Sequence, residues 1–224
     1  MARDMRPGPF EIGYERLPSQ LPVFPLSGVL LLPRCRLPLN IFEPRYLRMT
    51  EDALAGGRLI GMVQPLDAGS GEPAPELFAT GCAGRITSFT ETDDGRILII
   101  LTGVCRFDVG SELVVDTAYR QVEPRWEPYR SDLLEIADGG IDRERLYASL
   151  RFYFEARDLD TDWDALDEAT DEKLVNSLAM SCPFDPTEKQ ALLEAEGLSE
   201  RTRLMLALLN MAALHPASGD MPLH

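Results

Sequence analysis

The hydrophobic pattern of the chain changes near residue 120, and this change limits the folds open to it. Before that point, apolar residues form short runs that are interrupted by glycine and proline. After it, they recur at the three- and four-residue spacing of amphipathic helices. The sequence therefore predicts an α+β organisation, in which a β-rich first part is followed by a helical second part.

The first part contains about six candidate strands, and prolines interrupt several of them. Because proline cannot donate a hydrogen bond to a neighbouring strand, we expect these strands to be short and to lie at sheet edges or strand ends. Closely spaced turns between so many short strands favour a small barrel over an open sheet. The expected strands cover residues 21–26, 29–33, 37–41 and 58–66, a hairpin over 85–107 with Asp94-Gly95 in its turn, and 113–122.

Two further expectations concern this first part. The run from Ile97 to Leu101 is apolar at every position, so that strand should be buried on both faces. One helix should interrupt the strands, because Pro44 suits a first helical position after Glu43 and Gly56-Gly57 can end the helix.

The second part should contain four helices. An apolar stripe marks each of the first two. The first helix, over 142–157, carries Leu146, Leu150 and Phe154, and the second carries Leu174, Leu178 and Cys182. The third should begin with a capping box made by Asp185 and Glu188 around Pro186, and Gly197 should end it. Ser199 can cap the fourth, whose later turns are apolar almost all round and should be buried.

The expected organisation of the whole chain follows from these elements. It comprises an N-terminal extension (1–20), a β-barrel with one inserted helix (21–122), a connector (123–140), a helical bundle (141–215) and a flexible tail (216–224).

The chain is strongly acidic, with 22 basic and 37 acidic side chains and a net charge of −15. Residues 1–120 carry 12 basic and 15 acidic groups (net −3), and residues 121–224 carry 10 and 22 (net −12). A nucleic-acid backbone would be repelled, so we expect no nucleic-acid partner. No apolar stretch approaches the roughly 20 residues of a membrane helix, and the first residues lack the apolar core of a signal peptide. We expect a cytoplasmic protein without a membrane partner.

The residues that commonly carry catalysis or bind metals form no convincing site. A cysteine nucleophile would need a positioned imidazole, but both histidines, His215 and His224, lie in a terminal segment rich in Pro, Gly and Ser. Neither lysine follows a glycine-rich loop, so no ATP site is predicted. The cysteines are widely spaced and suggest neither a zinc site nor a disulfide framework; they are Cys35, Cys82, Cys105 and Cys182.

Two weaker patterns do not indicate a functional site. Lys173 and Ser177 lie one helical turn apart, but Asp171 and Glu172 would raise the lysine pKa, so an exposed helix surface is the preferred interpretation of this Ser-Lys pair. Asp158, Asp160 and Asp162 imitate a calcium loop, but Trp163 and Ala169 occupy the positions that need Gly and Glu. We predict no metal and no cofactor.

Four segments, taken in order, resemble a known family. They read P-L-x-x-x-L-L-L-P over 25–33, L-P-L-x-I-F-E-P-R-Y over 37–46, G-x-x-R-F over 103–107, and the helical stretch 174–209. Together they are similar to the N-terminal, substrate-binding domain of Lon proteases. The resemblance implies a PUA-like, mostly antiparallel β-barrel followed by a C-terminal helical bundle.

The same resemblance implies a function. A full Lon enzyme continues into an ATPase module and a Ser-Lys peptidase, whose residues have no counterpart in this sequence. We therefore expect a stand-alone, non-enzymatic module that binds unfolded or exposed polypeptide segments, with a protease or chaperone as a further candidate partner. Two alternatives stay open: a scaffold that self-associates through its apolar last helix, and a hydrolase with an unrecognised site. The oligomeric state is left open.

The candidate contact residues are aromatic and methionine side chains, because grooves that recognise unfolded chains use such groups. They are Phe24, Phe42, Tyr46, Met49, Met62, Trp126 and Tyr129. A second set belongs to the family motif and is expected to lock the barrel to its helix, with Arg45 close enough to pair with Glu43. It consists of Pro25, Pro33, Pro38, Glu43, Pro44 and Arg45.

Overall fold

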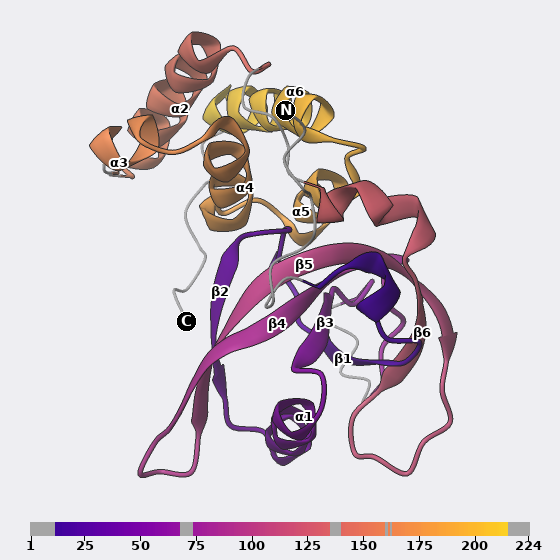
Figure 1. The fold of residues 1–224 in the computed structure, drawn as a ribbon. Coiled ribbons are helices and arrows are strands. Elements are labelled where there is room, and N and C mark those ends of the chain that lie inside the picture. The colour runs from indigo at the N-terminus through magenta and orange to yellow at the C-terminus, as the bar shows by residue number, and fades with distance from the viewer. Residues whose placement is uncertain (1–11, 68–73, 135–139, 160, 162, 215–224) are drawn as a thin grey trace, which may run out of the picture. The chain divides into compact units, whose positions relative to one another are not determined.

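The computed structural model describes residues 12–67, 74–134, 140–159, 161 and 163–214. The chain forms two compact units, residues 1–135 and 136–224. The first unit contains all the described strands and is called the barrel unit, and the second contains α2 to α6 and is called the helical unit (Figure 1).

The barrel unit contains six strands joined in one sheet. They are β1 (Leu21–Pro25), β2 (Arg36–Ile41), β3 (Leu59–Val63), β4 (Thr80–Glu91), β5 (Ile97–Glu112) and β6 (Gln121–Arg125), in the order β2-β5-β4-β3-β1-β6. An additional β5–β6 pairing joins β1, β3, β4, β5 and β6 into a ring. Every pairing is antiparallel except β1–β3. The predicted mostly antiparallel barrel is confirmed, although the β5–β6 ladder that closes it is broken between Val109 and Glu112.

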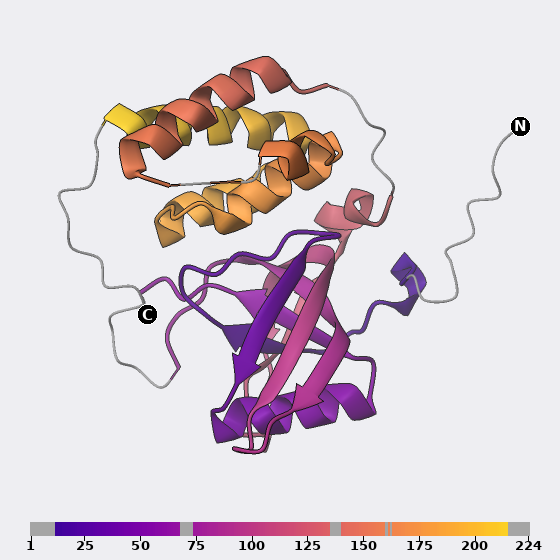
Figure 2. The ribbon, with the colours of Figure 1, turned by 90° about the vertical axis from the view of Figure 1, so that its left-hand side faces the viewer.

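The long strand β5 takes part in two different ladders. Its first half, 97–102, pairs with β2, and its second half, 108–112, pairs with β6, while β4 runs along its other edge. As a result β2, the first half of β5 and the second half of β4 form a three-stranded extension of the ring. The extension is seen in front in Figure 2.

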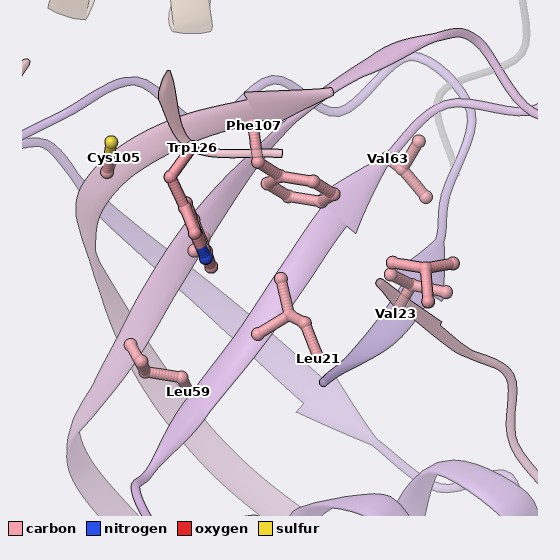
Figure 3. Packing of buried hydrophobic residues seen from close by; sticks show 9 residues of the cluster. Leu21, Val23, Leu59, Val63, Cys105, Phe107 and Trp126 are labelled. Atoms are coloured by element: carbon pink, nitrogen blue, oxygen red, sulfur yellow. The ribbon is translucent and has the colours of Figure 1, made fainter. Parts of the chain in front are cut away.

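The ring encloses an apolar core built around Phe107 and Trp126, whose ring centroids are 5.6 Å apart (Figure 3). A Cβ atom on Gly61 or Gly81 would lie 2.8 Å from the Phe107 ring, so only glycine leaves room for this side chain. The core residues are Leu21, Val23, Leu59, Val63, Ala83, Cys105, Phe107, Val122 and Trp126.

A buried ion pair joins the last segment of the unit, the 3₁₀ helix η2 (Glu127–Leu133), to β5. The Asp132 carboxylate accepts hydrogen bonds from the backbone N–H, Nε and Nη2 of Arg106 at 2.8–3.0 Å. The two side chains are 4% and 8% exposed, so each charge depends on the other for its solvation.

Three strand expectations were wrong. Leu30, Leu31 and Leu32 are buried but lie outside any strand, between residues with left-handed backbone at Gly28 (φ +71°) and Arg34 (φ +64°). Residues 113–120 form no strand, since β5 ends at Glu112 and β6 begins at Gln121. The run 97–101 is not buried on both faces, because Leu98 is 45% exposed.

Three other expectations for this unit are confirmed. The hairpin turn contains Gly95 with a φ of +80°. The helix α1 spans Pro44–Ala55, with Pro44 in its first turn, Glu43 before it and Gly56 at its end. Prolines lie at strand ends in β1, and β2, which contains Pro38, is at one end of the sheet.

The helical unit contains α2 (Arg143–Arg157), α3 (Trp163–Asp167), α4 (Asp171–Ser181), α5 (Pro186–Glu194) and α6 (Leu198–Leu214). The predicted capping box of α5 is present, and the Glu188 carboxylate accepts the Asp185 N–H at 2.8 Å. α3 was not predicted. None of the described helices is long and apolar enough to cross a bilayer.

Details at the two ends of α6 differ from the expectation. α5 ends at Glu194, before Gly197, and α6 begins at Leu198, so Ser199 lies inside the helix. The later turns of α6 are not buried all round, because Met211 is 59% and Leu214 is 68% exposed.

Candidate functional site

The three-stranded extension presents one of its faces to solvent. Side chains of directly paired residues lie on the same face of a sheet, so the pairings define two rows, Asn40–Leu98–Thr90 and Pro38–Ile100–Ser88. The alternate residues Ile97, Ile99 and Leu101 are buried, and they therefore mark the opposite face. We call the solvent-facing set the open face; it consists of Arg36, Pro38, Asn40, Ser88, Thr90, Leu98, Ile100 and Thr102.

The open face has no carboxylate, although the chain contains 37 acidic residues. Its apolar groups are Pro38, Leu98 and Ile100, and its one charged member, Arg36, lies in a row with Thr102 and with Arg85 of β4 at the border of the face. Such a surface can desolvate at lower cost than the acidic surface found elsewhere, because few charges lose their hydration. It is suited to contact with uncharged, apolar groups.

Phe42 extends this apolar character at the end of β2. The residue directly follows the strand, and its side chain is 60% exposed. The Arg96 guanidinium, from the turn before β5, lies 5.8 Å from the centre of the Phe42 ring. A polypeptide lying along the open face can therefore reach an exposed aromatic ring.

The free edge of β2 is poorly suited to adding another strand. No described strand pairs with this edge, but Pro38 in its middle has no N–H to donate. An added strand would therefore meet an incomplete ladder. The side chains of the open face, rather than the backbone of β2, are the groups best able to bind a ligand.

Most of the predicted contact residues are not on this surface. Five of them are buried: Phe24, Tyr46, Met49, Met62 and Trp126. The centroids of the Phe24 and Tyr46 rings lie 4.1 Å apart, and this contact packs β1 against α1. Tyr129 is half-buried and donates its hydroxyl to Asp108 Oδ1 at 3.0 Å. Of the seven, Phe42 alone is exposed, and the sequence reasoning missed Leu98 and Ile100.

Three residues of the family motif, Glu43, Pro44 and Arg45, lie at the start of α1, whereas Pro25 ends β1, Pro33 lies between β1 and β2, and Pro38 lies within β2. Arg45 Nη2 lies 2.9 Å from Glu43 Oε2, which confirms the expected pairing. The Arg45 guanidinium also stacks 4.6 Å from the centre of the Tyr46 ring. Pro33 is buried and Pro25 half-buried, whereas Pro38 and Pro44 are exposed.

The groups considered for covalent chemistry are poorly placed for it. All four cysteines are buried and free. Burial raises the pKa of the Cys105 and Cys182 thiols to about 12 and that of Cys82 well above its ordinary value, so these thiols stay protonated and weakly nucleophilic. Lys173 is exposed on α4, as expected.

Metal binding gains no support either. No cluster of three or more metal-ligating side chains occurs among the residues that the structure describes. In the segment that imitates a calcium loop, Asp158 ends α2 with left-handed backbone, while Asp160 and Asp162 lie outside the described residues, as do His215 and His224.

Comparison with known proteins gives a family match over most of the chain. The pattern of the ATP-dependent protease La (LON) substrate-binding domain matches residues 20–211. Among curated proteins, Lon protease of Flavobacterium johnsoniae is 25% identical over 210 residues, which is 90% of this chain and 25% of that protein. Lon protease 2 of Myxococcus xanthus is 27% identical over 211 residues, covering 89% of this chain and 24% of that protein. The chain thus spans about a quarter of the length of these relatives.

Two solved structures share the fold. A Lon N-terminal domain protein from Xanthomonas campestris has a TM-score of 0.60 and 25% identity, covering 84% of this chain and 97% of its own. The N-terminal domain of Lon protease from the Mycobacterium avium complex has a TM-score of 0.57 and 15% identity, covering 85% and 98%.

Proposed function

The chain belongs to the LON substrate-binding domain family, and from this premise we propose that it binds apolar polypeptide segments on the open face without modifying them. The observation that carries the proposal is the absence of carboxylates from a surface with exposed Leu98 and neighbouring Phe42, in a chain of net charge −15. The ligands would be unfolded or exposed segments of other proteins, which offer apolar side chains that folded proteins bury.

The non-enzymatic part of the proposal is supported by the chemistry of the candidate nucleophiles. The Cys82, Cys105 and Cys182 thiols are buried with raised pKa values, which disfavours the nucleophilic thiolate, and Lys173 is exposed on α4 rather than enclosed in a site. We further propose a cytoplasmic location and transfer of the bound segment to a protease or chaperone. A hydrolase would be indicated by turnover that Lys173→Ala or Ser177→Ala abolishes.

Binding can be tested by fluorescence anisotropy with a labelled, uncharged apolar peptide whose two ends are blocked. Leu98→Ser and Phe42→Ser should each weaken binding about tenfold, because each removes apolar area from the interface. Phe152→Ser is the matched control, since Phe152 is 49% exposed on α2 of the helical unit, and it should leave binding unchanged. Equal losses in all three variants, or no binding at about 1 mM peptide, would refute the proposal.

A second candidate function is self-association through α6. Met211 and Leu214 are 59% and 68% exposed near the end of this helix, and exposed apolar groups of this kind can form an interface between copies. Light scattering tests this directly. A dimer that Met211→Ser converts to a monomer would support it, and a monomer at millimolar concentration would count against it.

A further inference from the structure

A pocket of about 290 Å³ lies at one end of the barrel, and none of the open face residues lines it, although its Arg85 is paired with Thr102 of that face. Its floor lies over Leu21 and Leu59, the first residues of the parallel strands β1 and β3 and members of the barrel core. Because these two side chains are 0% and 7% exposed, the apolar surface open to a ligand is that of the half-buried Ile12, Pro18 and Pro22. Its wall is completed by the C-terminal end of α1 and by the segment that precedes β1. Small-molecule pockets begin at about 300 Å³, so this one suits a group the size of one or two amino-acid residues.

Three arginines from different parts of the chain line this pocket: Arg16, Arg58 and Arg85. Arg16 ends the short 3₁₀ helix η1 (Tyr14–Arg16), Arg58 follows α1, and Arg85 is paired with Leu59 across β3 and β4. Because paired residues share a face, Arg85 lies on the same side of the sheet as the floor residue Leu59.

The pocket has one lining carboxylate, and that carboxylate is already engaged. Asp52 Oδ2 accepts a hydrogen bond from the Tyr119 hydroxyl at 2.9 Å, and Asp52 Oδ1 lies 3.0 Å from Arg48 Nη2. The lining is therefore net positive by two charges in a chain whose net charge is −15. A ligand with an apolar body and one negative group would match both the floor and the rim.

The backbone of Arg58 supplies a second, independent observation. Its φ is +60°, a left-handed conformation that costs a non-glycine residue about 1–2 kcal/mol. Two hydrogen bonds hold it there, from its own N–H to Ala53 O and from the Ile86 N–H to its carbonyl, both at 2.8 Å. Glycine would adopt this backbone conformation without strain. The strained position therefore indicates a role for the arginine side chain rather than for the backbone.

The segment that carries Arg16 is also held in place. The Tyr14 hydroxyl donates to Glu127 Oε2 at 2.6 Å, and Trp126 Nε1 donates to the carbonyl of Pro18 at 2.9 Å. These contacts position both sides of Arg16 against the barrel end. The pocket is thus assembled before any ligand enters, which lowers the cost of binding.

We propose that this pocket binds the C-terminal residue of a polypeptide, with an apolar side chain against Ile12, Pro18 and Pro22 and the α-carboxylate among Arg16, Arg58 and Arg85. Guanidinium groups bind carboxylates through short, charge-assisted hydrogen bonds, and a chain terminus supplies one carboxylate beside one side chain. The inference rests on the proposed function in that its ligand is a polypeptide. It adds that free C-termini are preferred over internal segments.

The test uses the full chain and two labelled hexapeptides that end in leucine, one with a free carboxylate and one with a C-terminal carboxamide. The carboxamide should bind at least about tenfold more weakly in anisotropy titrations, because it lacks the charge. Arg58→Gly should weaken binding of the carboxylate peptide about tenfold and leave that of the carboxamide unchanged. The variant relieves backbone strain, so misfolding does not explain a loss of binding.

Arg34→Gly is the matched control, since Arg34 is the other described arginine with left-handed backbone (φ +64°) and does not line the pocket. It should leave the affinity of both peptides unchanged. Equal affinity of the two peptides overturns the inference. So does displacement of the carboxylate peptide by inorganic phosphate at the concentration at which N-acetyl-leucine displaces it, which would indicate a general anion site.

Amide chemical shifts separate this inference from the proposed function. Shifts at Arg58, Leu59 and Arg85 that need the free carboxylate support the pocket. Shifts confined to the open face with both peptides overturn the pocket and leave the proposed function standing. Carboxylate-dependent shifts at the pocket with none on the open face support the pocket and refute the open face as the binding surface.

Discussion

The barrel unit and the helical unit stabilise their buried charges in different ways. In the barrel unit, Arg106 and Asp132 form a closed ion pair between segments 26 residues apart. In the helical unit, buried Lys189 and Arg201 donate to backbone carbonyls, of Met180 at 3.3 Å and Leu192 at 2.9 Å. Arg201 also donates to Asn176 Oδ1 at 3.0 Å, and buried Asp171 pairs with Arg143, whose side chain is 31% exposed. The barrel unit thus encloses both charges of an ion pair, whereas the buried charges of the helical unit are matched by neutral oxygens or by a partly exposed partner.

The units also differ in charge. Residues 1–135 carry 14 basic and 19 acidic groups (net −5), and residues 136–224 carry 8 and 18 (net −10). The more acidic unit repels other acidic chains and favours solubility. The less acidic unit contains both the open face and the arginine-lined pocket. The proposed ligand binding therefore belongs to the less acidic unit.

The largest expected effect comes from breaking the buried ion pair. Asp132→Asn should lower the free energy of unfolding of the barrel unit by about 3–5 kcal/mol, because it leaves the Arg106 charge buried without its counter-charge. Asp171→Asn in the helical unit should cost only about 1 kcal/mol, since its partner Arg143 is 31% exposed.

The two tryptophans allow each unit to be followed separately. Trp126 lies in the barrel unit and Trp163 in the helical unit, and the chain contains no other tryptophan. Denaturant unfolding of a Trp163→Phe background reports the barrel unit, and a Trp126→Phe background reports the helical unit. Equal losses for Asp132→Asn and Asp171→Asn would contradict the contrast between the units.

Alkaline pH should destabilise the barrel unit more steeply than the helical unit. Burial raises the pKa of two barrel thiols, Cys82 and Cys105, and of one helical thiol, Cys182. A thiol whose pKa is raised in the folded state contributes its full stabilisation of the fold below the ordinary thiol pKa of about 8.5. This contribution is lost as the pH rises toward the pKa of the folded state. Between pH 9 and 10 each thiol should cost about 1 kcal/mol.

Unfolding measured at pH 8, 9 and 10 checks this expectation. The barrel unit should lose more stability than the helical unit over the last step, because its tyrosines with raised pKa values add to the effect of its two thiols. Cys105→Ala should remove about 1 kcal/mol of the loss in the barrel unit. A slope that Cys105→Ala leaves unchanged would show that the thiols are not the cause.

A smaller effect is expected at the start of α5. Asp185→Ala removes half of the capping box and should lower the stability of the helical unit by about 1 kcal/mol. The barrel unit should be unaffected in the same denaturant experiment. A loss of stability in the barrel unit would show that the units do not unfold independently.

The smallest expected effect is a gain of stability. Arg58→Gly should raise the stability of the barrel unit by about 0.5–1 kcal/mol, since glycine adopts the left-handed backbone at lower cost. A destabilised variant would mean that the Arg58 side chain supports the fold rather than a ligand.

The two units also differ in how much of them could be predicted from the sequence. Helices of the second unit depend on local signals, and the capping box of Asp185 and Glu188 correctly predicts the start of α5. The short α3 and the boundary between α5 and α6 lack such clear signals and were missed. The apolar run Leu30–Leu32 predicted a strand, but these buried residues are held out of the sheet by the left-handed turns at Gly28 and Arg34. The conformation of these turns depends on backbone geometry and on contacts with distant residues, which the sequence pattern does not reveal.

The candidate site was harder to predict for a related reason. Aromatic residues were chosen as contacts, but Phe24, Tyr46 and Trp126 pack the interior, since large apolar side chains contribute most by being buried. Leu98 and Ile100 lie in a run that is apolar throughout, and only the pairing with β2 and β4 shows which residues face outward. The pocket arginines are up to 69 residues apart, from Arg16 to Arg85, so no spacing in the sequence connects them.

One titration tests the central claim most directly. Adding an uncharged apolar peptide with blocked ends to the isotope-labelled chain should shift the amide signals of β2, the first half of β5 and the second half of β4, and leave α2 to α6 unchanged. Shifts confined to the helices, or none at about 1 mM peptide, would contradict the assignment of polypeptide binding to the open face of the barrel unit.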